Sequence, residues 1–472
     1  MKIKSLKISN ILSFKHTNDL ASASDISFED NLNIIIGENG AGKSTALEVI
    51  NFLFKRVLFK QYNVNQDLYQ NRTRLQNPDK KQILSPANNV SFSGFRLGPN
   101  WNSESQVQRI RISVKLDEID IKNIENLQKN LEKLTAIGLF YTNKTISTAI
   151  GIQPEYTMEV SLDRLTNNFE VTIIEGMRDF GFEYLTEYNF FRELIDLYNL
   201  ENLEKPITQL YESFTLISSY RNYHAFNSSI SLRDQHPSQQ IYTIRTQDFS
   251  KSINANDQSE PSIFWLVRLR VAEKHFTLIS HKYSEEECEQ IANDLPFIQS
   301  INKRLKIINL ECKIKLFDLR TWQYTFEFFD TKREKRILDI NSLSAGQKAI
   351  THLIFEAYGR GELKGGVVII DEPEIHLHYQ FQNEYLLVIK ELNKEQNCQY
   401  VLVTHSDALI NSSTINHVKR FSLDASGYTE IKSPNLSTDE KTLIKILDNT
   451  RSTYAFFAKK VLLVEGDTEV LP

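Results

Sequence analysis

Three short apolar segments, each followed at once by glycine or polar residues, indicate buried β-strands. They are residues 32–36, 367–370 and 400–403. Residues 44–60 follow the first segment and 381–392 precede the third, and both carry apolar residues at helical spacing. Because alternating buried strands and helices are typical of a parallel sheet covered on both faces, the pattern predicts an α/β fold with a mostly parallel sheet.

The long segment 61–330 has a different pattern. Apolar and polar residues alternate along 110–116 and 310–316, which predicts half-buried antiparallel strands. Residues 119–134 and 184–220 have a more helical pattern. No heptad repeat continues through the segment, which argues against a long coiled coil that bridges DNA. We therefore expect an insertion made of antiparallel strands and helices.

Composition and charge exclude several classes of protein. The 472 residues are 41% hydrophobic and 24% charged, as in ordinary globular domains. Lys and Arg number 55 against 60 Asp and Glu, and the net charge of −5 excludes the overall basic field of a protein that coats nucleic acid. Three cysteines are too few for a disulfide scaffold, and no apolar run approaches the roughly 20 residues of a membrane span. The N-terminus lacks the apolar core of a signal peptide, so we expect a cytoplasmic protein without membrane contact.

A glycine-rich turn joins the first strand to the first helix. Residues 37–44 read Gly-Glu-Asn-Gly-Ala-Gly-Lys-Ser and match the phosphate-binding pattern G-x-x-x-x-G-K-[ST]. In such a loop, backbone N–H groups surround the phosphates, Lys43 neutralises them and the Ser44 hydroxyl coordinates Mg²⁺. The candidate nucleotide-binding residues are therefore Gly37, Glu38, Asn39, Gly40, Ala41, Gly42, Lys43, Ser44 and Thr45.

Carboxylates and an imidazole follow the other two strands. Asp371 and Glu372 end the second strand, and His405 follows the third. At the carboxyl edge of a parallel sheet, these side chains face the ligand. Asp371 is then placed to hold Mg²⁺, Glu372 to polarise the water that attacks the γ-phosphorus, and His405 to bond the γ-phosphate as a neutral imidazole. Taken alone, each of the three also fits an ordinary polar strand end.

A second helix begins with residues suited to bind phosphate. Residues 343–348 read Leu-Ser-Ala-Gly-Gln-Lys, and Ser344 fits the N-cap of a helix with an apolar stripe. The first turn of such a helix offers backbone N–H groups to an anion. An ordinary capped helix is the alternative interpretation. Arg221 is a further candidate to reach a phosphate, with a solvated or ion-paired arginine as its alternative.

These motifs and their order resemble the ATP-binding-cassette ATPases of the SMC and RecF type. The phosphate loop, a signature-like sequence at 343–347, the strand that ends in two carboxylates and the switch histidine occur in family order. The resemblance implies bound ATP and Mg²⁺, and a head-to-head homodimer or higher homo-oligomer in which the signature of one chain completes the ATP site of the other. Ala345 stands where the family has glycine, and Gln66 and Gln106 are both candidates for the family's glutamine loop. The signature residues that would act in trans are Ser344, Ala345, Gly346 and Gln347.

A finer resemblance connects the chain to the OLD family of ATPases. Residues 371–378 read Asp-Glu-Pro-Glu-Ile-His-Leu-His, which is similar to the corresponding segment of OLD proteins. Residues 460–469 resemble the start of a Toprim nuclease domain, which follows the ATPase in that family. Glu465 would hold Mg²⁺ there together with a later Asp-x-Asp pair, and no such pair follows before Pro472. We therefore expect an incomplete nuclease in this polypeptide, from either a truncated chain or a split system with a separate nuclease or effector chain.

The expected domain organisation follows from these assignments. Residues 1–60 and 331–455 form a discontinuous ATPase core, 61–330 form the insertion, and 456–472 begin a Toprim-like domain. The fold we expect is an ABC-type P-loop ATPase with a mostly parallel sheet, an antiparallel β subdomain and an α-helical insertion.

The leading functional hypothesis is a dimeric ATPase that binds and hydrolyses ATP and controls a Toprim DNA nuclease, in line with a role in anti-phage defence. DNA would be contacted through the complete assembly. One alternative is an ATP-gated scaffold that regulates a separate effector protein, and another is a DNA repair ATPase of the SMC or RecF type. Replacing Glu372 with Gln separates the first two hypotheses, because hydrolysis needs this carboxylate and binding does not.

Overall fold

The structure is a computed structural model. The residues it describes are 1–60, 62–64, 84–86, 95–142, 146, 151–166, 168–202, 204–223, 226, 229–231, 240–241, 243–244, 261–279, 283–318, 323–333, 335–337, 339–361, 363–411 and 413–433. The Toprim-like segment 456–472 with Glu465, and the glutamine candidate Gln66, lie outside the described residues.

A six-stranded sheet forms the centre of the molecule, in the order β17-β16-β3-β15-β14-β9. Its first five strands in chain order pair in parallel, and the edge strand β17 is antiparallel to β16. This arrangement confirms the predicted α/β fold with a mostly parallel sheet. The bounds are β3 Leu32–Gly37, β9 Glu212–Ile217, β14 Leu363–Asp371, β15 Gln399–Val403, β16 Val418–Leu423 and β17 Thr429–Lys432.

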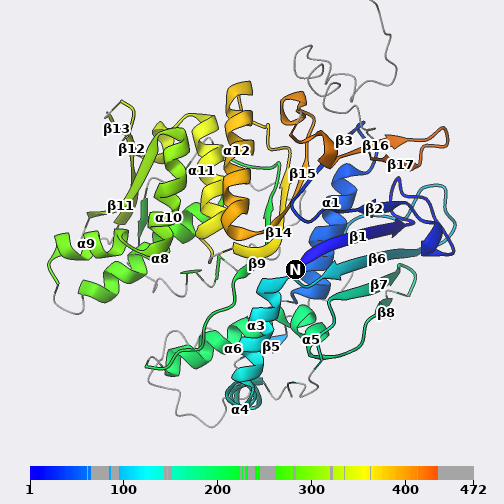
Figure 1. Ribbon diagram of the computed structural model, residues 1–472, viewed down its shortest axis with the longest axis horizontal. Coiled ribbons are helices and arrows are strands. Elements are labelled where there is room, and N and C mark those ends of the chain that lie inside the picture. The colour runs from blue at the N-terminus through cyan, green and yellow to red at the C-terminus, as the bar shows by residue number, and fades with distance from the viewer. Residues whose placement is uncertain are drawn as a thin grey trace, which may run out of the picture.

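Helices cover both faces of this sheet, as the apolar strands predict (Figure 1). Alternate residues of β14 enter different cores: Val367 and Ile369 share a core with α1, whereas Val368 and Ile370 share one with α11 and α12. Helix α1 spans Lys43–Phe52 and continues as a π-helical segment, Leu53–Leu58. Helices α11 and α12 span Ala345–Tyr358 and Tyr379–Gln396. The phosphate-loop helix and the signature helix therefore pack on opposite faces of the sheet.

A second, antiparallel sheet lies beyond α1, in the order β2-β1-β6-β7-β8 (Figure 1). Its buried residues share one core with α1, so this helix packs between the two sheets. The strands are β1 Lys2–Ser9, β2 Asp25–Ser27, β6 Val107–Lys115, β7 Glu155–Asp163 and β8 Asn168–Glu175. The helices that accompany them are α3 Glu118–Lys129, α4 Leu131–Thr142, α5 Phe180–Thr186 and α6 Tyr188–Glu201.

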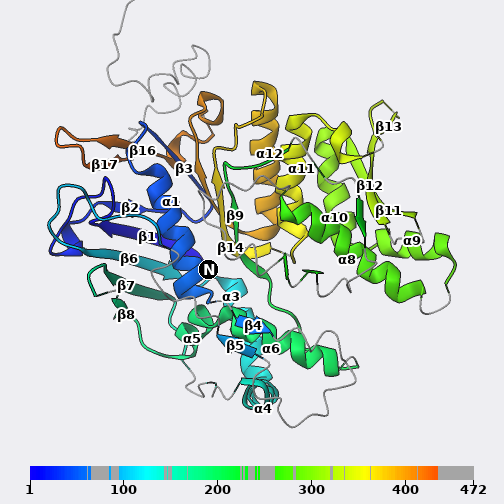
Figure 2. The same cartoon turned by 180° about the vertical axis from the view of Figure 1, so that it is seen from behind.

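A third lobe lies on the far side of α11 and α12, where a small antiparallel sheet packs with helices (Figure 2). Its strands are β10 Ser229–Ser231, β11 Leu310–Asp318, β12 Gln323–Asp330 and β13 Lys335–Ile337. Its helices are α8 Ser262–Ile279, α9 Glu285–Asn293 and α10 Pro296–Leu305. A separate hairpin pairs β4, Tyr62–Val64, with β5, Leu84–Pro86.

Strand pairing crosses the boundary expected between core and insertion. Strands β6, β7 and β8 come from the range 61–330, and β6 pairs with β1 in the antiparallel sheet. The predicted strands at 110–116 and 310–316 are confirmed as β6 and β11. The helical interpretation of 184–220 was wrong for residues 212–217, which form β9 beside β14 in the parallel sheet (Figure 2). The helical spacing of 184–201 extended the predicted helix too far. The strand character of 212–217 depends on pairing with β14, about 150 residues later in the sequence, which the local pattern does not show.

Candidate nucleotide-binding site

The carboxyl ends of three parallel strands meet at one edge of the sheet. β3 ends at Gly37, β14 at Asp371 and β15 at Val403. The register pairs Val403 with both Asp371 and Ile35, so β14 and β15 end level with each other and β3 continues two residues further, to Gly37. The segments that follow are the phosphate loop, the carboxylate pair and the segment with His405. The structure thus brings together the catalytic and nucleotide-binding residues that the sequence predicts.

Glycines give the phosphate loop its shape. Gly37, Gly40 and Gly42 have φ values of 142°, 80° and 90°, which residues with a Cβ rarely adopt. A Cβ on Gly37 would lie 1.9 Å from the carbonyl oxygen of Phe421 in β16. At Gly42 it would lie 2.8 Å from the ring of Phe14. The loop therefore packs closely against Phe421 at Gly37 and against Phe14 at Gly42. Gly40 has open space around it.

The Lys43 side chain folds back onto the backbone of its own loop. Its Nζ donates to the carbonyl oxygens of Gly37 at 2.9 Å and Glu38 at 2.8 Å. Burial lowers the pKa of Lys43, and the nearby carboxylates of Glu372 and Asp371 oppose that change. Gly42 is the N-cap of α1, so the ammonium group lies beside the positive end of a helix. This combination favours a bound anion, and Ser44 is exposed next to it.

Two hydroxyl groups brace the loop, and the sequence motifs did not reveal them. Thr429 Oγ1 lies 2.7 Å from Ser13 Oγ and 3.1 Å from the carbonyl oxygen of Ala41. The backbone N–H of Thr429 donates to the Ser13 carbonyl at 2.9 Å. Since these residues lie at opposite ends of the chain, no local pattern predicts their contact.

Asp371 has the environment of a metal ligand. The side chain is buried, and burial raises its pKa to about 6. Its Oδ1 has no hydrogen-bond partner among the described residues. A buried carboxylate oxygen without a partner, at the sheet edge where the phosphate loop begins, is the kind of donor that Mg²⁺ accepts. Asp371 and Ser44 therefore fit the predicted ion.

Glu372 follows on a strained turn. Its φ is 47°, in the left-handed region, and its side chain is 36% exposed. Glu372 Oε1 lies 4.0 Å from His405 Nε2. Burial, together with the charge of Lys43, lowers the pKa of His405, so its imidazole is neutral at pH 7. The two groups are thus close enough to act on one small reactant, with the His405 imidazole in its neutral form.

Glu374 holds the histidine segment in place. Its Oε1 accepts the backbone N–H of His405 at 2.6 Å, and its Oε2 accepts the hydroxyl of Thr404 at 2.7 Å. Sequence analysis gave Glu374 no role of its own. The available signal was its position two residues after Glu372, at the end of the neighbouring strand.

The signature residues begin α11 as predicted. Ser344 and Gln347 form a capping box: Ser344 Oγ accepts the Gln347 N–H at 3.3 Å, and Gln347 Oε1 accepts the Ser344 N–H at 3.0 Å. Ser344 and Ala345 are exposed. Gly346 is buried, and a Cβ there would lie 2.7 Å from the ring of Phe381. Within one chain, Gly346 therefore has a packing reason to be glycine, and α11 lies on the opposite face of the sheet from α1.

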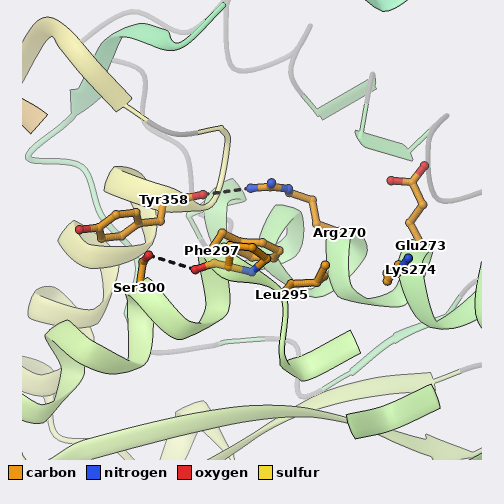
Figure 3. Close-up of a pocket in the computed structure, with 8 residues that line it drawn as sticks. Arg270, Glu273, Lys274, Leu295, Phe297, Ser300 and Tyr358 are labelled. Atoms are coloured by element: carbon orange, nitrogen blue, oxygen red, sulfur yellow. Dashed lines mark hydrogen bonds between the residues drawn. The ribbon is translucent and has the colours of Figure 1, made fainter. Parts of the chain in front are cut away.

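Other features lie away from this edge. A pocket of about 690 Å³ opens between α8 and α10 (Figure 3). There the Arg270 guanidinium stacks 4.0 Å from the Phe297 ring, and its Nη1 donates to the Tyr358 and Gly359 carbonyl oxygens at the end of α11.

Among the described residues, no cluster of three metal-ligating side chains occurs, and none of the described helices combines the length and the apolar character of a membrane span. Gln106 directly precedes β6.

Comparison with known proteins identifies the family. Residues 1–410 match the family model AAA_15, described as an AAA ATPase domain. The chain belongs to this family of ATPases.

Three curated relatives narrow the resemblance. The OLD nuclease of Thermus scotoductus is 30% identical over 132 residues, which cover 25% of this chain and 24% of that protein. The Retron Vc95 probable ATPase of Vibrio cholerae is 23% identical, covering 83% of this chain and 69% of that protein. Endonuclease GajA of Bacillus cereus is 23% identical, covering 99% and 69%. The predicted resemblance to OLD-family ATPases is confirmed, although the chain matches only about a quarter of the length of the OLD nuclease.

Among solved structures, the SMC head bound to the C-terminal winged-helix domain of ScpA is similar. It covers 93% of this chain and 100% of its own, with 13% identity and a TM-score of 0.44.

Proposed function

We propose that this chain binds ATP with Mg²⁺ in the loop 37–45 and hydrolyses it. The observation that carries the proposal is that β3, β14 and β15 end at the same edge of the sheet, which gathers the phosphate loop, two carboxylates and a neutral imidazole there. Ser44 and Asp371 would hold Mg²⁺, which neutralises phosphate charge when bound. Glu372 accepts a proton from the attacking water, and His405 donates a hydrogen bond to the γ-phosphate.

The proposed active unit is a homodimer. Ser344, Ala345, Gly346 and Gln347 would complete the ATP site of the partner. The exposed Ser344 and Ala345 at the start of α11 support this role, because the helix dipole favours an anion at this end. So does the placement of α1 and α11 on opposite faces of the sheet, which separates the signature from the chain's own phosphate loop.

We further propose that the ATPase controls a Toprim DNA nuclease in anti-phage defence. The support is the sequence around Glu465 and the names of two relatives, an OLD nuclease and an endonuclease. In this proposal, DNA is bound by the complete assembly, and Glu465 contributes one ligand to a second Mg²⁺ site.

Three variants test the ATPase. Lys43→Ala should abolish ATP binding, whereas Glu372→Gln should bind ATP normally and lose hydrolysis, measured by titration calorimetry and phosphate release. Glu286→Gln, on the exposed surface of α9, is the matched control and should hydrolyse ATP like the parent chain. Adding ATP and Mg²⁺ to Glu372→Gln should also double the mass measured by light scattering. If Glu372→Gln hydrolyses ATP at the parent rate, the proposed role of Glu372 is wrong.

A second candidate function is an ATP-gated scaffold that regulates a separate effector chain. It is favoured by the similarity to a retron ATPase over 83% of this chain. Under this alternative, Glu372→Gln would retain full regulation of the effector in cells, because ATP binding alone would set the state. Under the first proposal, the same variant would lose protection against phage.

A further inference from the structure

Arg221 is a buried arginine behind the turn that carries Glu372. It follows β9, the strand next to β14, and only 7% of it is exposed. Its Nη2 donates to the carbonyl oxygen of Asp371 at 3.2 Å and also to that of Glu372. The sequence left open a phosphate contact, solvation or an ion pair for this residue. In the structure its guanidinium instead donates hydrogen bonds to the backbone of the turn that carries Glu372.

The turn needs such support because its conformation is strained. A residue with a Cβ at φ 47° persists only where its surroundings hold it. Two main-chain hydrogen bonds help: Glu372 N donates to the Val403 carbonyl at 2.8 Å, and Ile375 N donates to the Glu372 carbonyl at 3.1 Å. Arg221 adds a charged donor to that same carbonyl oxygen, and charge-assisted hydrogen bonds are the stronger kind.

The other two guanidinium nitrogens of Arg221 make no hydrogen bond to the described residues. These atoms, Nε and Nη1, are both buried. Burying a cation is costly unless it is well bonded. The hydrogen bonds to the two carbonyl oxygens, together with the attraction between the guanidinium and the Asp371 carboxylate, hold the group behind the turn.

The segment with Arg221 is itself anchored to α11. Lys348 Nζ donates to the carbonyl oxygen of Tyr223 at 3.0 Å, and the Tyr223 hydroxyl lies 2.8 Å from His352 Nδ1. All three side chains are buried. Because both bonds join residue 223 to one rigid helix, the position of Arg221 is fixed relative to the turn.

We propose that Arg221 is a positioning residue for hydrolysis: it holds the peptide of Glu372 so that the carboxylate points at the attacking water. This inference rests on the proposed ATPase function. It predicts that loss of the guanidinium slows the chemical step and leaves nucleotide binding intact, because Lys43 and the phosphate loop do not contact Arg221.

The experiment compares Arg221→Lys, Arg221→Ala and Tyr223→Phe with the parent chain. Turnover should fall about 10- to 100-fold in both Arg221 variants, as expected for a displacement near 1 Å of a catalytic group, with the dissociation constant for ATP unchanged. Tyr223→Phe removes the hydroxyl that bonds His352 and also interacts with Arg221, and it should lower turnover by a smaller factor. Arg304→Lys is the matched control, since Arg304 is equally buried but pairs with Glu391 and Glu395 on α12.

The outcomes separate this inference from the proposed function. If the parent chain hydrolyses ATP and both Arg221→Lys and Tyr223→Phe keep its turnover, the positioning role is wrong and the ATPase stands. Equal losses of turnover and ATP affinity, or the same loss in Arg304→Lys, would also overturn the role. A parent chain that binds ATP without hydrolysing it would overturn both proposals. If Arg221→Ala does not fold, Arg221→Lys and Tyr223→Phe carry the test.

Discussion

Gly37 and Gly40 lie in the same loop and both have positive φ, yet an added methyl group should affect them very differently. At Gly40 an added Cβ meets nothing within 4 Å. The cost of Gly40→Ala is then the left-handed backbone alone, roughly 1–2 kcal/mol, and ATP affinity should fall by no more than about 30-fold. At Gly37 the added Cβ lies 1.9 Å from the Phe421 carbonyl oxygen. An ordinary contact begins at 3.4 Å, so the loop or β16 must move by about 1.5 Å.

That movement displaces the carbonyl group that Lys43 binds. Forcing a side chain into filled space adds roughly 1–3 kcal/mol to the backbone cost, so Gly37→Ala should lose about 100-fold or more in ATP affinity. Titration calorimetry with ATP and Mg²⁺ measures both variants, and Gly98→Ala, where an added Cβ also meets nothing within 4 Å, is the control. Equal affinities for Gly37→Ala and Gly40→Ala would refute the argument that contact with β16 shapes the loop.

Four further substitutions test single side chains. Asp371→Asn should raise the melting temperature at pH 7.5 without Mg²⁺ or nucleotide, because burial raises the pKa of Asp371 to about 6. The folded chain then binds this proton more tightly than the unfolded chain, so stability is lost as pH rises from about 4 to 6, and the advantage of Asn should vanish at pH 4. Glu374→Gln replaces one of two acceptor oxygens with a donor group, at a cost of about 1.5–3 kcal/mol, and should lower phosphate release about tenfold; unchanged turnover would show that His405 needs no such anchor. Thr429→Val and Ser13→Ala should each weaken ATP binding about threefold to tenfold, and the double variant no more than Thr429→Val alone, since that variant already removes the hydrogen bond that Ser13 shares; additive losses would contradict this.

The residues that the sequence could predict are those whose chemistry is local. The glycine spacing of 37–44 and the apolar runs before Asp371 and His405 identify strand ends without any knowledge of pairing. What they could not reveal is contact between distant segments. Ser13 and Thr429 are 416 positions apart, and Arg221 and Asp371 are 150 apart. The strand character of β9 was missed for the same reason, because pairing with β14 and not local pattern determines it.

The hairpin of β16 and β17 contacts the phosphate loop at two points. The Phe421 carbonyl lies against Gly37, and the Thr429 hydroxyl lies 3.1 Å from the Ala41 carbonyl oxygen. A fragment that stops after β15 would still contain each glycine of the loop, Lys43 and both carboxylates. It would lack the β16 and β17 residues that contact the loop and fix its conformation. A minimal nucleotide-binding unit of this protein must therefore extend through Lys432, and any load pulling on the chain beyond that point acts three residues from the loop's own brace.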